Sequence, residues 1–145
     1  MANQELHQIE DLLKLEKLIT KHRDRFELRY SDERDLQVLL ASVDEGTVKD
    51  EITHWCFITF ADNGDKPGSQ VFLTGYRSEG FPLMTSCVQK VDFERKAVIT
   101  KSGSLYMLSG EPAEIPVGAD LVLAIAATFN AWSVGPVLGM PAATW

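Results

Sequence analysis

The stretch of residues 52–110 constrains the fold more than any other part of the chain. It consists of short runs rich in Val, Ile, Thr, Phe and Tyr, separated by Gly, Pro, Asn and Asp. Such runs are typical of antiparallel strands joined by turns. The first run has apolar side chains on both faces, so we expect it to lie centrally in a sheet. The sequence predicts four or five strands, over residues 52–61, 71–76, 83–91, 97–100 and 104–108.

Two helices are predicted before these strands. Apolar residues recur at intervals of three and four over residues 5–22, which is the pattern of an amphipathic helix. Residues 32–43 show helical spacing as well, with Gly46 as a stop signal, although a strand through residues 36–40 is the alternative. Between the two helices, apolar and charged residues alternate over Phe26–Tyr30, which indicates a short strand or an extended connector.

The last element expected is an Ala-rich helix over residues 117–132, with apolar residues all round its axis. A helix of this kind is buried on most sides. Helices and strands are segregated along the chain, which predicts an α+β fold with an antiparallel sheet covered by helices on one face. No internal repeat or linker divides the sequence, so residues 1–145 are expected to form one domain. The predicted core consists of the residues at strand centres and on the last helix: Trp55, Phe57, Ile58, Val71, Leu73, Val88, Val98, Leu105, Leu121 and Ile125.

The composition limits which partners and which cellular compartment are expected for this protein. The 14 Lys and Arg residues against 21 Asp and Glu give a net charge of −7, which argues against binding to double-stranded nucleic acid. Neither a signal peptide nor a disulfide framework is recognisable, so we expect an acidic, soluble, cytoplasmic protein with reduced thiols. No charged residue follows Asp120, and residues 121–140 approach the length of a membrane span. Interrupting Gly, Pro, Asn and Ser residues and the lack of a basic flank argue against a membrane.

Three residues are candidates for reactivity. His54 and Cys56 are two positions apart on a predicted strand, so they would share a face, and Cys87 lies on another strand. A structural zinc site normally needs four ligands in closely spaced pairs, and a catalytic Cys–His pair needs a third group to orient it. The sequence offers neither, and free cysteines are usually buried as small apolar residues. We therefore expect no metal, no cofactor and no catalytic residue.

Charge is unevenly distributed over the first third of the chain. Residues 14–29 hold six basic and three acidic residues, a net charge of +3, whereas residues 32–51 hold seven acidic and two basic residues, a net charge of −5. Solvated faces with intramolecular ion pairs explain such runs in most proteins. The alternative interpretation is a bipolar surface used for docking.

The sequence alone does not determine the function. Residues 135–145 are apolar, and so must cover the chain's own core or another subunit. The leading hypothesis is a non-enzymatic interaction protein, a homo-oligomer or a binder of a protein partner, with residues 121–145 at the interface.

The competing hypothesis is a small-molecule-binding protein or enzyme with a pocket between the sheet and the last helix. Binding of single-stranded nucleic acid through aromatic residues is a third hypothesis, which the net charge opposes. The candidate pocket residues are Trp55, Phe57, Phe72, Tyr76, Tyr106 and Trp132.

Overall fold

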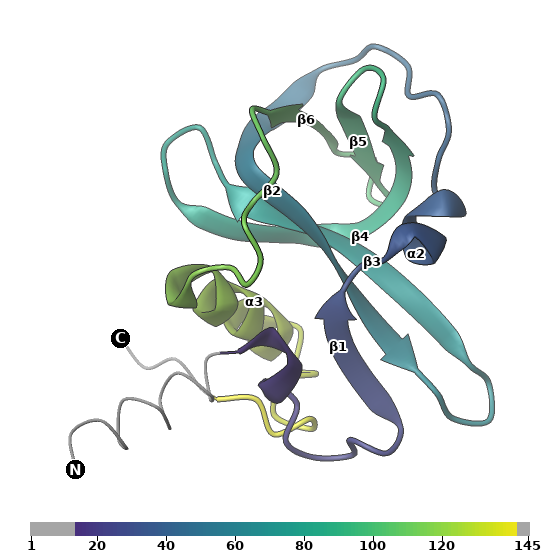
Figure 1. Ribbon diagram of the computed structural model, residues 1–145, viewed down its shortest axis with the longest axis vertical. Helices are drawn as coiled ribbons and strands as arrows, with labels where there is room; N and C mark the ends of the chain where they lie inside the picture. Colours follow the sequence, from purple (N-terminus) through teal and green to yellow (C-terminus); the bar gives the residue numbers. More distant parts are fainter. Residues whose placement is uncertain (1–13, 142–145) are drawn as a thin grey trace.

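A computed structural model describes residues 14–141 as a six-stranded sheet that closes into a small barrel, with one helix packed on its outside (Figure 1). The ring of strands lies at the top of Figure 1 and helix α3 lies below it. The elements in chain order are η1 (Leu15–Lys17), β1 (Phe26–Tyr30), α2 (Glu33–Gln37), β2 (Val48–Asp62), β3 (Gly68–Tyr76), β4 (Pro82–Asp92), β5 (Ala97–Thr100), β6 (Leu105–Ser109) and α3 (Ala119–Ala131).

The barrel closes because β2 is long enough to serve two sheet edges. Consecutive strands from β1 to β6 pair antiparallel, and β6 then returns to pair in parallel with residues 48–53 of β2. The remainder of β2 pairs with β1 and β3, after a bulge between Thr53 and Cys56. Within the bulge, His54 has a φ of 46°, a conformation that non-glycine residues rarely adopt. The bulge bends the strand and lets one segment join both sides of the ring.

Gly75 is required where β3 passes this bend. A Cβ atom built on Gly75 would lie 2.5 Å from Cγ2 of Ile52 and 2.8 Å from the carbonyl oxygen of Thr53. Any side chain would therefore push β3 away from β2 at the point where β2 changes partners.

Most side chains of the sheet alternate between two large cores, and Val43, Ala97 and Leu105 form a small third cluster. One core fills the barrel and includes Phe57, Leu73 and Val98; the other lies between the outer face of the sheet and α3 and includes Ile58 and Phe72. This division explains the apolar side chains on both faces of β2. Nine of the ten predicted core residues are buried; the tenth, Trp55, is half-buried.

The apolar C-terminal segment folds back onto the outer core. Leu138 and Met140 are 1% and 6% exposed. The carbonyl oxygen of Leu138 accepts hydrogen bonds from the amides of Thr20 and Lys21, at 2.9 and 3.0 Å. The sequence left two alternatives for this segment, the chain's own core or another subunit. Leu138 and Met140 cover the chain's own core. None of the helices in the described part of the chain is both long and apolar enough to cross a membrane.

The strands of the central region agree with the sequence prediction to within a few residues, but there are six strands instead of four or five. The additional strand is β1, at the segment for which a short strand or a connector was expected. The last predicted helix is confirmed as α3, which runs over Ala119–Ala131 and packs on the sheet.

The two predicted N-terminal helices are wrong where the structure describes them. Residues 5–13 lie outside the described part, and only Leu15–Lys17 form a single 3₁₀ turn in the rest of the first prediction. The amides of Thr20 and Lys21 bind the C-terminal segment instead of continuing a helix. The helical spacing reflects burial of Leu15, Leu18 and Ile19 against the outer core.

The second predicted helix is limited to Glu33–Gln37, where a capping box between Asp32 and Asp35 stabilises its start. It ends early because Leu39 and Ala41 form backbone hydrogen bonds with Val91 of β4, at 2.9 and 3.1 Å. Leu40 thereby forms an isolated bridge with Val91. The alternative reading of this segment as a strand therefore holds at one residue only.

Candidate functional site

The three reactive candidates do not form a site. The bulge in β2 breaks the alternation of side chains, so that His54 is exposed while Cys56 packs in the outer core. Burial raises the pKa of the Cys56 thiol to about 12. Cys87 is half-buried beside the same core, and both thiols are free. Within residues 14–141 no cluster of His, Cys, Asp and Glu has the geometry to hold a metal ion.

The six aromatic candidates are distributed over several places. Phe57 lies inside the barrel and Phe72 in the outer core. Trp55 contacts Phe57, with ring centroids 6.0 Å apart. Tyr76 lines one cavity, while Tyr106 and Trp132 line another. This last cavity is bounded by β4 and α3, and two of the six aromatic candidates line it. That it binds a ligand stays a prediction.

We call this cavity of about 400 Å³ the β4–α3 pocket. Its volume lies in the lower part of the usual range for small-molecule sites. Strands β2, β4 and β6, helix α3 and the turns after β3 and β5 contribute to it. Its lining comprises two cations, six hydroxyl-bearing residues and three apolar residues: Lys49, Arg77; Thr85, Ser86, Ser102, Ser104, Tyr106, Thr128; Leu83, Met84 and Trp132.

A bulge in β4 and a tight turn after β5 place the hydroxyl groups. The register of β3 against β4 shifts next to Thr85, whose Oγ1 accepts a 3.2 Å hydrogen bond from the amide of Leu73. The adjacent Ser86 hydroxyl lies 3.0 Å from that of Ser102, which lies 2.8 Å from that of Thr100. These bonds connect β4 to the turn after β5, where Gly103 has a φ of 90°.

Arg77 is oriented by a carboxylate outside the pocket. Its Nε donates to Oδ2 of Asp50 at 2.9 Å, and Asp50 also accepts from the amide and the hydroxyl of Ser78. These donors lower the pKa of Asp50, Arg77 contributing most. Within residues 14–141, the terminal nitrogens of Arg77 make no hydrogen bond.

Lys49 is the second cation of the pocket. Its ammonium group has no hydrogen bond or ion pair with a described residue. No described Asp or Glu lines the pocket either. The β4–α3 pocket therefore combines two positive charges with no negative charge in its lining.

The hydroxyl of Tyr106 is the most informative polar group. Tyr106 is 6% exposed, its ring packs in the barrel core, and it lines the pocket. Its hydroxyl has no hydrogen-bond partner among residues 14–141. Because no described side-chain nitrogen or oxygen is both fully buried and unpaired, this hydroxyl must retain contact with solvent. Tyr106 and Arg77 both line the pocket, which is the cavity open to this side chain.

Trp132 supplies the largest apolar surface of the pocket. Its indole ring packs against Phe72 and Phe129, with centroids 5.5 and 5.7 Å apart. These contacts fix the ring, and the side chain is still 41% exposed.

The cavity that Tyr76 lines, of about 380 Å³, contains acidic residues in place of the two cations of the β4–α3 pocket. It lies at the N-terminal end of α3 and is lined by His54, Tyr76, Glu111 and Glu114, among others. The Tyr76 hydroxyl donates to Asp120 at 2.9 Å. Burial and this carboxylate together raise the pKa of Tyr76 to about 12. This tyrosine is already satisfied by an intramolecular partner, unlike Tyr106.

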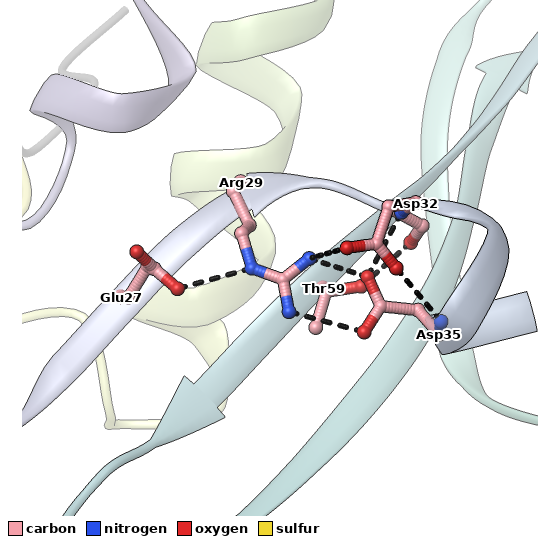
Figure 2. Close-up of polar contacts among 6 residues, drawn as sticks. Glu27, Arg29, Asp32, Asp35 and Thr59 are labelled. Atoms are coloured by element: carbon pink, nitrogen blue, oxygen red, sulfur yellow. Dashed lines mark hydrogen bonds and ion pairs between the residues drawn. The ribbon is translucent and has the colours of Figure 1, made fainter.

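The opposed charge runs of the sequence meet in an intramolecular network (Figure 2). Arg29 of β1 binds Glu27 at 3.0 Å and forms a two-armed pair with Asp35 of α2, while Asp32 lies 3.7 Å away. Arg29 lowers the pKa of Asp35 to about 2. The pairing accounts for part of the charge segregation as ordinary ion pairs. The docking interpretation of these runs stays a prediction.

Sequence reasoning missed the two cations and the serines of the pocket. Ser102 and Ser104 belong to a Lys-Ser-Gly-Ser stretch that matches no phosphate-binding or nucleophile motif. Lys49 stands in an acidic run, where a count of charges along the chain hides it. Only the folded barrel brings these residues together with Arg77.

Searches against protein-family models, curated proteins and solved structures found no match to this chain. The side chains of the β4–α3 pocket are therefore the basis for inferring function.

Proposed function

We propose that this protein binds a small anionic molecule in the β4–α3 pocket. The observation that carries the proposal is that Lys49 and Arg77 both line a pocket to which no described Asp or Glu contributes, in a chain of net charge −7. A random surface depression on such a protein would be expected to include acidic groups, as the cavity lined by Tyr76 does with Glu111 and Glu114.

The physical argument is electrostatic. Two like charges that share a partly enclosed cavity repel each other more strongly than they would in bulk water. An anion placed between them removes this repulsion and forms charge-assisted hydrogen bonds, which are about twice as strong as neutral ones. The hydroxyl of Tyr106, which has no partner among the described residues, adds a neutral donor on a ring that is held in the barrel core.

The proposal is tested by titrating the full chain with inorganic phosphate and measuring the dissociation constant by NMR or calorimetry. Lys49→Gln removes one charge that forms no ion pair with a described residue, and we expect it to weaken phosphate binding about tenfold. Lys66→Gln, in the turn between β2 and β3, removes the same charge elsewhere and serves as the matched control. An absence of saturable binding, or equal affinities in the two variants, would contradict the proposal.

The interface hypothesis from the sequence is the second candidate. Its main support has weakened, because Leu138 and Met140 cover the chain's own core. It retains one observation: Trp132, Val134 and Val137 are 41%, 38% and 60% exposed within six residues of one another. Light scattering on the full chain and on Val137→Glu tests it, since loss of assembly with an unchanged fold would support an interface. A chain that is monomeric at all concentrations would refute it.

A further inference from the structure

We infer that the anion bound in the β4–α3 pocket is a phosphate monoester that carries a planar ring. This inference rests on the proposed function and adds the chemical class of the ligand. Two independent features of the pocket lead to it: the number of free donors at one part of its lining, and the fixed indole ring of Trp132 at another.

The free donors match a phosphate group better than a carboxylate. The Ser86 and Ser102 hydroxyls already bond to each other, and Thr128 donates to the carbonyl oxygen of Ala124 at 2.8 Å. The remaining donors without a described partner are the Lys49 ammonium, the terminal nitrogens of Arg77 and the hydroxyls of Ser104 and Tyr106.

Charge points the same way as the donor count. A carboxylate carries one negative charge on two oxygens. A phosphate monoester carries about −1.5 to −2 at neutral pH on three terminal oxygens. Two cations and two hydroxyls therefore complement the three terminal oxygens of a phosphate more fully than the two oxygens of a carboxylate, and Arg77 offers its terminal nitrogens while Asp50 holds its Nε.

The ring of the ligand is inferred from Trp132. Trp132 lines the pocket, is 41% exposed as a residue, and packs its ring against Phe72 and Phe129. Aromatic side chains gain free energy by stacking on another ring. Leu83 and Met84 extend the same apolar part of the lining. A planar group could stack on the indole with little loss of side-chain freedom, because the ring is already fixed.

The cavity volume limits the size of the ligand. About 400 Å³ lies near the lower end of the range for small-molecule pockets, roughly 300–1,000 Å³. A compound with one ring system and one phosphate suits this volume, and a dinucleotide does not.

The test compares three probes on the full chain by calorimetry: phenyl phosphate, methyl phosphate and benzoate. We expect phenyl phosphate to bind roughly two- to tenfold more tightly than methyl phosphate, the range that corresponds to one aromatic contact. Benzoate should bind more weakly than phenyl phosphate. Trp132→Leu should abolish the preference for the phenyl ring, which is read as the ratio of the affinities for phenyl phosphate and methyl phosphate in the same variant.

Two further variants separate the two inferences. Lys49→Gln should weaken the binding of phenyl phosphate and of methyl phosphate equally, so that the ratio of their affinities is preserved. Trp132→Phe keeps an aromatic ring and should restore part of the preference, which guards against a general effect of Trp132→Leu on folding. Circular dichroism confirms that each variant is folded.

The outcomes are distinct. Equal affinities for phenyl and methyl phosphate would overturn the planar ring and leave anion binding intact. Benzoate binding as tightly as phenyl phosphate would overturn the choice of phosphate. If none of the three probes binds, the proposed function itself fails, and the present inference fails with it.

Discussion

The ion pair between Arg29 and Asp35 predicts a specific dependence of stability on pH. Asp35 has a side chain that is 9% exposed, and its pKa is lowered from 3.8 to about 2, first by Arg29 and then, against the opposing effect of burial, by the amide of Asp32. A shift of one pKa unit corresponds to about 1.4 kcal/mol, so this shift represents about 2 kcal/mol of folding free energy. Because the pKa is lowered in the folded state, this stability is present above about pH 4, the value of an unpaired carboxyl, and is lost as the pH falls through 2.

The perturbation is Asp35→Asn, and the assay is urea denaturation of wild type and variant at several values between pH 7 and pH 2. At pH 7 the variant should lose about 2 kcal/mol of unfolding free energy, and the difference should shrink as the wild-type carboxyl becomes protonated. Glu27→Gln is the matched control, because Glu27 binds the same Arg29 at the surface with 52% of its side chain exposed. Surface pairs contribute about 0–1 kcal/mol. A loss in Asp35→Asn that is independent of pH would refute the reasoning.

Three other predictions test the fold. Gly75→Ala should destabilise the protein by about 1–3 kcal/mol in urea, because its Cβ would meet Ile52 and Thr53. Gly68→Ala, which has nothing within 4 Å of the added atom, should be close to neutral, and equal effects would contradict the barrel packing. Leu138→Ala should lower the free energy of unfolding by about 2–5 kcal/mol and Val137→Ala by less than about 0.5 kcal/mol, since only Leu138 is buried. The reverse order would mean that the C-terminal segment packs differently. A thiol reagent should label Cys87 well before Cys56 in the native protein, because Cys56 is buried and its pKa is raised to about 12. Mass spectrometry after short labelling would show this, and equal rates would argue against the outer core.

The sequence predicted the parts of the fold that have a local cause. Residues of β5 were predicted without error, because alternation of side chains and flanking turn residues are read directly from the chain. Closure of the barrel could not be predicted in this way. It depends on parallel pairing of Val48 with Leu105 and on the bulge at His54, and neither leaves a local pattern. The N-terminal helices were predicted wrongly because apolar residues spaced by three or four can also cover a core from an irregular segment, as Leu15, Leu18 and Ile19 do.

The candidate site was predictable only in outline. Tyr106 and Trp132 are among the six aromatic candidates because large aromatic side chains are common in binding sites, and both line the β4–α3 pocket. The other four aromatic candidates lie elsewhere in the fold, since aromatic character does not indicate which face of a strand or helix meets a cavity. The contribution of Lys49 and Arg77 depends on the positions of strand ends in space. Charge counted along the sequence places Lys49 in a negative run, whereas in the fold it lines a positive pocket.

The central claim is that the β4–α3 pocket binds an anion through donor groups that have no partner among residues 14–141. Tyr106→Phe tests it most directly, because this change removes one hydroxyl and keeps the ring in the barrel core. The account predicts that the variant unfolds in urea like wild type, since the hydroxyl has no partner among the described residues. It also predicts that the variant binds inorganic phosphate about tenfold more weakly, the loss expected for a hydrogen bond to a charged group. An unchanged dissociation constant for phosphate would contradict the account.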